Sequence, residues 1–251
     1  GRSYMDRYIL ARGKVRFMGD PVAAVAADTL AIAKAALKKI KVTYEPLPVV
    51  IDQEEAMKLD APTLHDDMPL PKNIPEGVKV KNVCGFAQVH VGDPEKAMAE
   101  ADVVVDEVYE TKMIHPQYLE PRMAAAQMEP NGRLTVWANA QAPFPVRQEV
   151  AKMLGLALNN VRVIAADIGG GFGGKGSGIT SGAAVEPICG LLAMKTKRAV
   201  MIVLDKAEET ISTTIRSGAR MYIKTGVKKD GTIVARTGKV IYDTGGYSGF
   251  G

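Results

Sequence analysis

Cysteine and histidine are scarce in this sequence. Among its 251 residues there are two cysteines, Cys84 and Cys189, and three histidines, His65, His90 and His115. The cysteines lie far apart, and neither has a second cysteine at the spacing of a metal-ligand pair. This pattern excludes a disulfide framework and an iron–sulfur cluster held within the chain. With so few histidines, we also expect no metal ion bound directly by its side chains.

The sequence also lacks a long uninterrupted apolar segment and a block of like charge. Its longest apolar stretch, GAAVEPICGLLAM, contains Glu186 and Pro187, and we therefore expect no membrane-spanning helix. The first ten residues do not have the layout of a secretion signal. The 32 basic and 28 acidic residues are interspersed, so no polybasic arm indicates nucleic acid or membrane as a partner. We expect a cytoplasmic protein.

What the sequence does contain is a mixture of strand and helix patterns, which predicts an α+β fold. Residues 1–50 predict a β-β-α-β unit, with strands at 14–19, 21–28 and 41–48 and a helix at 29–40. No strand precedes residues 7–10 to close such a sheet, so we expect further residues upstream. Residues 60–82 carry four of the fourteen prolines and little periodicity, which is typical of a linker.

The second part of the chain continues the mixed pattern. Two hairpins are expected, one at 124–139 with an Asn-Gly turn and one at 219–243 with an Asp-Gly turn. Helices are predicted at 95–101, at 144–156 with its end near Gly155, and at 177–196, where Pro187 is expected to interrupt it. Strands are predicted at 103–113, 161–167 and 198–205, and the last of these is of a buried type.

A glycine-rich stretch, DIGGGFGGKGSG at 167–178, joins a predicted strand to a predicted helix. Gly169, Gly171 and Gly174 match the dinucleotide-binding pattern G-x-G-x-x-G, but the acidic residue expected about twenty positions later is absent. The same stretch resembles a phosphate-binding loop, except that Gly176 replaces the serine or threonine that would bind magnesium. A tight turn that only serves packing is the third alternative. The residues alone leave these three interpretations open.

Several segments in a fixed order resemble the molybdenum-binding subunit of the molybdenum hydroxylases, which include xanthine dehydrogenases and aldehyde oxidoreductases. These are HPQYLEPRMAAAQ, NAQAPFPVRQEVAKMLGL and VRVIAADIGGGFGGK, with KVRFMGDPVAAVAAD and VTYEPLPVVID upstream and KTGVKKDGTIVARTGKVIYDTGGYSGFG downstream. The resemblance implies the C-terminal part of an α/β-hammerhead domain at 1–62. It further implies a linker at 63–82 and the first part of a molybdopterin-binding α+β domain at 83–251.

The resemblance assigns cofactor contacts to two places. The loop of Gly171, Phe172, Gly173 and Gly174 would pack against the molybdenum centre and its pterin, since main chain without Cβ atoms can approach a ligand closely. Gln141 would donate a hydrogen bond from its amide to the metal's oxo ligand. Phe172 would form an apolar wall next to the substrate.

Other positions bear on the substrate and on which residues have a structural role. Gly176 lies where xanthine-oxidising relatives often carry a glutamate, and this favours an aldehyde or aromatic heterocycle over a purine. For His115 and Glu120 we expect a structural role, and for Arg147 and Lys175 solvated charges rather than phosphate contacts. The catalytic base, a glutamate, is expected outside this chain, and the chain by itself is expected to be inactive.

The function implied by the resemblance is hydroxylation of an aldehyde, an aromatic heterocycle or a purine carbon with oxygen derived from water. The implied cofactor is a molybdenum–pterin, possibly in the cytosine dinucleotide form. Electrons would pass to [2Fe–2S] and FAD centres in other domains or subunits, alongside the remainder of the molybdenum subunit. The alternative is a nucleotide- or partner-binding α+β module without redox chemistry.

Overall fold

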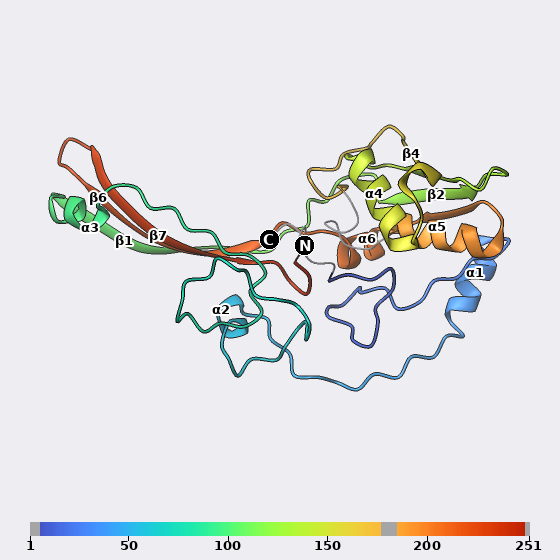
Figure 1. The fold of residues 1–251 in the computed structure, drawn as a ribbon, viewed down its shortest axis with the longest axis horizontal. Helices are drawn as coiled ribbons and strands as arrows, with labels where there is room; N and C mark the ends of the chain where they lie inside the picture. The colour runs from blue at the N-terminus through green and yellow to red at the C-terminus, as the bar shows by residue number, and fades with distance from the viewer. Residues whose placement is uncertain (1–5, 177–184, 249–251) are drawn as a thin grey trace. The chain divides into compact units, whose positions relative to one another are not determined.

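The computed structural model describes residues 6–176 and 185–248 (Figure 1). The fold is mixed α+β, as predicted. Its backbone contacts divide the chain into two compact units. The first unit comprises residues 1–47 and 115–216, and the second comprises residues 48–114 and 217–249. Each unit is built on its own sheet.

The sheet of the first unit has four strands in the order β4-β3-β2-β5. β2 (Met123–Met128) and β3 (Leu134–Ala138) form the predicted antiparallel hairpin, and Gly132 in its turn has a φ of 82°. β4 (Val161–Ala165) runs parallel to β3, while β5 (Val200–Val203) pairs with β2 in the antiparallel direction. The crossover from β3 to β4 passes through α4 (Pro143–Leu154) and the 3-10 turn η1 (Leu158–Asn160).

The core of this unit lies between one face of the sheet and the helices α4 and α5 (Val185–Thr196). Alanines on β2 allow α5 to approach closely, because a small side chain leaves room for helix backbone. The opposite face is more exposed and carries the single tryptophan, Trp137, on β3. The buried cluster comprises Ala124, Ala126, Leu134, Val136, Ala138, Ala140, Val146, Val150, Ala151, Val161, Val185, Cys189 and Ala193.

Two predictions for this unit need correction. Pro187 does not interrupt the helix in the described part of the chain, because α5 continues without a break from Val185 through Pro187 to Thr196. The rest of the predicted helix, residues 177–184, lies outside the described residues. β5 is not a buried strand, since Met201 is 65% exposed and Val203 52%. It is an edge strand with one covered face.

The predicted strands at 14–19, 21–28 and 41–48 do not form among the described residues. A strand needs a partner for its backbone N–H and C=O groups, and these three segments pair with no other strand in the described part of the chain. The helix between them does form, as α1 (Leu30–Leu37), with the Thr29 hydroxyl accepting a hydrogen bond from the Ile32 N–H at 3.3 Å.

The second unit is a long antiparallel sheet in the order β1-β6-β7, with β1 (Val103–Thr111), β6 (Gly218–Val227) and β7 (Ile233–Asp243). The β6–β7 hairpin turns where the Asp-Gly pair predicted it, and Gly231 has a φ of 89°. Two short helices accompany the sheet, α2 (Gln53–Ala56) and α3 (Pro94–Ala99). Arg220 on β6 joins α2 to the sheet through Asp52 and Glu54 at 3.0 and 2.6 Å.

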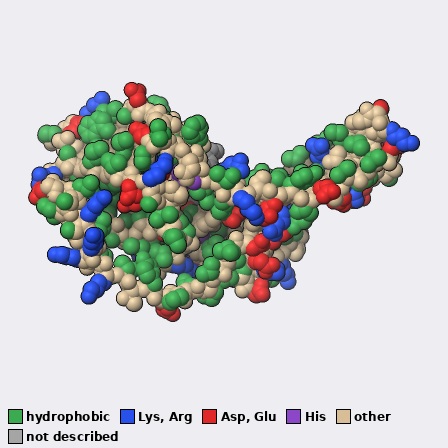
Figure 2. All heavy atoms as spheres, turned by 180° about the vertical axis from the view of Figure 1, so that it is seen from behind, with side chains coloured by type: hydrophobic (Ala, Val, Ile, Leu, Met, Phe, Trp, Pro, Cys, Tyr) green, Lys and Arg blue, Asp and Glu red, His purple; other side chains and the backbone are tan. Residues whose placement is uncertain are grey.

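The surface carries charges of both signs. Figure 2 shows basic and acidic side chains interspersed with hydrophobic ones on the face that it presents. Within the described ranges, no helix is both long enough and apolar enough to cross a membrane.

Candidate cofactor site

The functional residues predicted from the sequence meet at one edge of the first unit's sheet. Because β3 and β4 are parallel, their carboxyl ends lie at the same edge, and open α/β sheets bind ligands at such edges. β2 begins and β5 ends at this edge, since both pairings are antiparallel. We call the segments that gather there the site edge: residues 115–122, 139–141, 166–176 and 204–213.

Gln141 follows β3 and is bonded to the glycine loop that follows β4. Its side-chain oxygen accepts hydrogen bonds from the backbone N–H groups of Gly173 and Lys175, both at 3.1 Å. Two donors facing one atom fix the amide orientation, because the opposite orientation would set NH₂ against N–H. The Nε2 group therefore points away from these two donors on an exposed side chain, and it has no acceptor among the described residues.

Two loop glycines, Gly169 and Gly174, are required by packing inside the chain, and a third, Gly171, lies against the movable side chain of Gln141. A Cβ atom at Gly171 would lie 2.5 Å from the Gln141 side-chain amide, and one at Gly174 would lie 2.6 Å from the Tyr118 ring. A Cβ at Gly169 would lie 2.6 Å from the Cβ of Glu120. These contacts explain part of the glycine content without any ligand.

The outer side of the same loop is exposed and does not pack against other described parts of the chain. Phe172 is 77% exposed and has a φ of 47°, a left-handed conformation that is unusual for a bulky residue. Gly173 also has a positive φ, 86°, and a Cβ there would meet nothing within 4 Å. The backbone N–H groups of Gly170, Gly171 and Phe172 donate to no acceptor in the described part of the chain. Such a row of donors suits an anionic or electron-rich group.

Lys175 is not the solvated charge that the sequence predicted. Its side chain is fully buried, with Nζ 2.7 Å from Glu120 Oε2 and 4.8 Å from the centre of the Tyr118 ring. The Glu120 oxygen also accepts the Gly169 N–H at 2.8 Å. Burial alone would raise the pKa of Glu120, but the hydrogen bonds from Lys175 and Gly169 outweigh it and hold this pKa below its usual value.

His115 and Glu120 do not pair with each other. The His115 Nδ1 accepts the Gln117 N–H at 2.9 Å, so Nε2 carries the proton and donates to the Thr213 hydroxyl, also at 2.9 Å. Burial lowers the pKa of His115 and favours this neutral form. Both side chains thus hold segments of the site edge together.

Helix α6 (Lys206–Ser212) supplies a buried carboxylate to this edge, and the sequence analysis missed it. Its Glu209 accepts hydrogen bonds from the Tyr118 hydroxyl and, at 2.5 Å, from the Arg122 N–H. The signal was present: Asp205 and Glu208 form a capping box, the spacing that begins a helix. Burial, followed by the bond to Glu209, raises the pKa of Tyr118.

Two further side chains have structural partners. Arg147 donates to the carbonyls of Leu158 and Val161, each at 2.7 Å, and so ties α4 to the start of β4. The carbonyl of Gly176 accepts a bond from the buried Arg122 at 3.0 Å. No group of three or more histidine, cysteine or acidic side chains within the described ranges could hold a metal ion.

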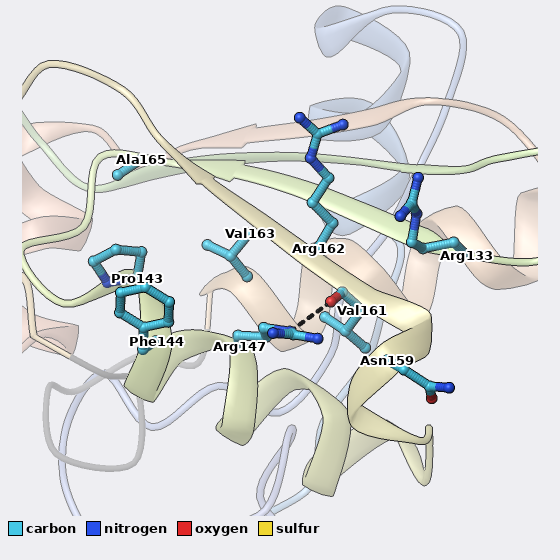
Figure 3. A pocket seen from close by; sticks show the side chains of 9 residues that line it. All are labelled: Arg133, Pro143, Phe144, Arg147, Asn159, Val161, Arg162, Val163 and Ala165. Atoms are coloured by element: carbon cyan, nitrogen blue, oxygen red, sulfur yellow. Dashed lines mark hydrogen bonds between the residues drawn. The ribbon is translucent and has the colours of Figure 1, made fainter.

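A shallow hollow of about 360 Å³ lies beside α4 and β4 (Figure 3). Arg133, Arg147, Arg162 and Phe144 are among its lining residues. Neither Gln141 nor the glycine loop contributes to it, so we do not assign the site to this hollow.

Comparison with known proteins identifies the family. The family described as molybdopterin cofactor-binding domain matches residues 76–251. The chain belongs to this family. Residues 2–48 match the a/b hammerhead domain of aldehyde oxidase and xanthine dehydrogenase. The chain is thus part of a molybdenum hydroxylase large subunit, in agreement with the resemblance seen in the sequence.

Individual relatives agree with this family. The nicotinate dehydrogenase large molybdopterin subunit of Eubacterium barkeri is 34% identical over 246 residues, which are 98% of this chain and 54% of that protein. The carbon monoxide dehydrogenase large chain of Afipia carboxidovorans is 33% identical over 244 residues, covering 95% of this chain and 29% of that one. The chain therefore spans about half the length of the first relative and under a third of the second.

Solved structures give the same result for the fold. The aldehyde oxidoreductase of Desulfovibrio gigas matches with a TM-score of 0.83 at 29% identity, over 95% of this chain and 24% of that chain. Quinoline 2-oxidoreductase of Pseudomonas putida 86 matches with a TM-score of 0.82 at 28% identity, over 95% of this chain and 28% of that chain.

Proposed function

We propose that the site edge binds the molybdenum end of a molybdenum–pterin cofactor, with contacts from Gln141 and from the loop Gly171, Phe172, Gly173 and Gly174. The single observation that supports this most directly is the orientation of Gln141. Its oxygen is used by the loop, so its Nε2 donor is the part left for a ligand. The family match supplies the cofactor class.

The residues present fit such a group. The outer side of the loop has free N–H donors and no side chain except that of Phe172, so an electron-rich ligand can reach main chain. Lys175 is paired with Glu120, and it therefore adds structure rather than a free positive charge. The site is thus built mainly from neutral donors, which suits a centre whose charge changes during a redox cycle.

When bound, the cofactor supplies the two-electron redox chemistry of hydroxylation with oxygen derived from water. The residues of this chain orient it. Gln141 Nε2 donates a hydrogen bond to it, the N–H groups of the loop fix its approach, and the Phe172 ring gives the substrate an apolar wall. A proton-accepting glutamate is expected outside this chain.

The complete protein is proposed to act on an aldehyde or an aromatic heterocycle, with Gly176 near the substrate. Some relatives are named for nicotinate, quinoline and aldehydes, which agrees with that class, while others are named for xanthine or carbon monoxide. The further proposals are a cytosine dinucleotide form of the pterin, [2Fe–2S] and FAD partners that take the electrons, and a cytoplasmic location. We also propose the domain limits 1–62 and 83–251.

The test is a Gln141→Glu substitution in the tagged chain, isolated from its own organism with the polypeptides that it assembles with. Glutamate keeps an acceptor for the Gly173 and Lys175 N–H groups but removes the Nε2 donor. We expect molybdenum per chain, measured by elemental analysis, to fall about tenfold while the melting temperature changes by only about 2 °C.

Gln148→Glu is the matched control, because Gln148 is an exposed glutamine on α4. This control should retain molybdenum and pterin fluorescence at the level of the unmodified chain. Unchanged molybdenum in Gln141→Glu would refute the role of this amide. A nucleotide in place of molybdenum in the unmodified assembly would refute the proposed function and favour a binding module.

A further inference from the structure

The two ends of the glycine loop are attached to a single oxygen atom. Glu120 Oε2 accepts the backbone N–H of Gly169 at 2.8 Å and the Lys175 ammonium at 2.7 Å. In addition, the Glu120 N–H donates to the Gly169 carbonyl at 3.3 Å. The carboxylate therefore closes a ring around residues 169–175, which include every loop residue that we assign to the cofactor.

This ion pair is buried to an unusual degree on the lysine side. The Lys175 side chain has no exposed area, while the Glu120 side chain is 26% exposed. The Tyr118 ring covers the ammonium at 4.8 Å. A buried pair contributes little net stability, because the loss of hydration offsets the attraction between the charges. What it does provide is a fixed geometry, since a buried ammonium has to stay next to its one carboxylate.

Lys175 also transmits this geometry to Gln141. Its main chain bonds Gln141 twice, accepting the Gln141 N–H at 2.8 Å and donating to the Gln141 side-chain oxygen at 3.1 Å. A displacement of the Lys175 backbone would therefore turn the Gln141 amide. Glu120 therefore acts on Gln141 through Lys175, although Glu120 precedes β2 and Gln141 follows β3.

We propose that Glu120 and Lys175 are positioning residues that hold the cofactor-facing side of the glycine loop and the Gln141 amide in their binding arrangement. This inference rests on the proposed function for its biological meaning. Whether the ion pair keeps the glycine loop ordered is a separate question, and it can be measured without any cofactor.

The experiment combines Lys175→Met with hydrogen exchange followed by mass spectrometry. Methionine has a similar length and packs well in apolar surroundings, but it leaves the carboxylate without its ammonium. We expect peptides that contain residues 169–175 to exchange about tenfold faster, while peptides from β2 and β3 keep their protection. Molybdenum per chain in the native assembly should fall about fivefold.

Glu129→Gln is the matched control. Glu129 pairs with Arg133 at 3.2 Å at the hairpin turn, at the opposite end of β2 and β3 from the site edge. This substitution should change neither the exchange of the loop nor the molybdenum content. Should Lys175→Met unfold the chain, the double substitution Glu120→Gln with Lys175→Met removes both charges and is expected to restore the fold.

The outcomes separate two failures. Unchanged loop exchange in Lys175→Met, or full molybdenum in a folded double variant, would overturn the positioning role. A folded double variant with fast loop exchange and low molybdenum would support it. If the unmodified assembly contains no molybdenum, the proposed function fails, and the exchange experiment still decides whether the ion pair orders the loop.

Discussion

Gln141 and Lys175 are joined by reciprocal hydrogen bonds: the Gln141 N–H donates to the Lys175 carbonyl at 2.8 Å, and the Lys175 N–H donates to Gln141 Oε1 at 3.1 Å. One residue follows β3 and the other belongs to the loop after β4. The bonds therefore link two neighbouring parallel strands beyond the end of their ladder. This linkage makes the position of the Gln141 side chain part of the fold.

Replacing Gln141 with alanine should destabilise the chain. Two backbone N–H groups lose their acceptor, and the cost of an unmet donor is about 1–3 kcal/mol when water cannot replace it. Because Lys175 is buried and Gly173 is exposed, we expect the free energy of unfolding, measured in urea, to fall by about 1–2 kcal/mol. Gln148→Ala on the surface of α4 serves as the control, with a change below about 0.5 kcal/mol. Equal effects of the two substitutions would contradict the structural role.

Alanine at position 174 tests the packing under the loop. Its Cβ would lie 2.6 Å from Cε1 of Tyr118, whose side chain has no room to move because it is fully buried. Overpacking of this kind costs about 1–3 kcal/mol. Gly231→Ala, in a turn where a Cβ meets nothing within 4 Å, should cost about 1 kcal/mol from its positive φ alone. If Gly174→Ala lowers the free energy of unfolding by less than Gly231→Ala, the Tyr118 ring can move aside, and the packing argument is wrong.

His115 should make stability depend on pH. Burial lowers its pKa below the usual 6.5, so the unfolded chain takes up a proton at higher pH than the folded one. The stabilisation is therefore complete above pH 6.5 and is lost as the pH falls from there toward the folded pKa. In urea unfolding, the advantage of the unmodified chain over His115→Gln should shrink below pH 6.5. An advantage that stays constant as the pH falls would contradict this prediction.

The two cysteines should differ in reactivity. Burial raises the pKa of the Cys189 thiol to about 12, and its S–H donates to the Val200 carbonyl at 3.1 Å. Because only the thiolate reacts, we expect Cys189 to be inert toward a thiol reagent at neutral pH. Cys84 is half-buried and should account for the reaction of the native chain. A Cys84→Ser chain that still reacts rapidly before denaturation would contradict this assignment.

The sequence predicted the elements whose signals are local. The Asn-Gly and Asp-Gly pairs located both hairpins, and Gly155 ended α4 in the left-handed conformation at a φ of 67°. The resemblance to a family directed attention to Gln141 and the glycine loop, which the structure joins by hydrogen bonds.

Elements that depend on distant partners were the ones that the sequence did not predict correctly. The strand patterns before residue 50 are local, but a strand exists only where another strand pairs with it. The burial of Lys175 depends on Glu120, which is separated from it by 55 positions in the sequence. A lysine in a glycine-rich loop gives no local sign of such a partner. Because most lysines are exposed, the sequence then predicts a solvated side chain.

Trp137 offers an optical reporter for all of these experiments. It is the single tryptophan of the chain, it is 39% exposed, and it lies on β3 just before the strand ends at the site edge. Its emission therefore originates next to the segment that carries Gln141. A coloured pterin that arrives there should quench this fluorescence, so that binding can be titrated in solution without a label.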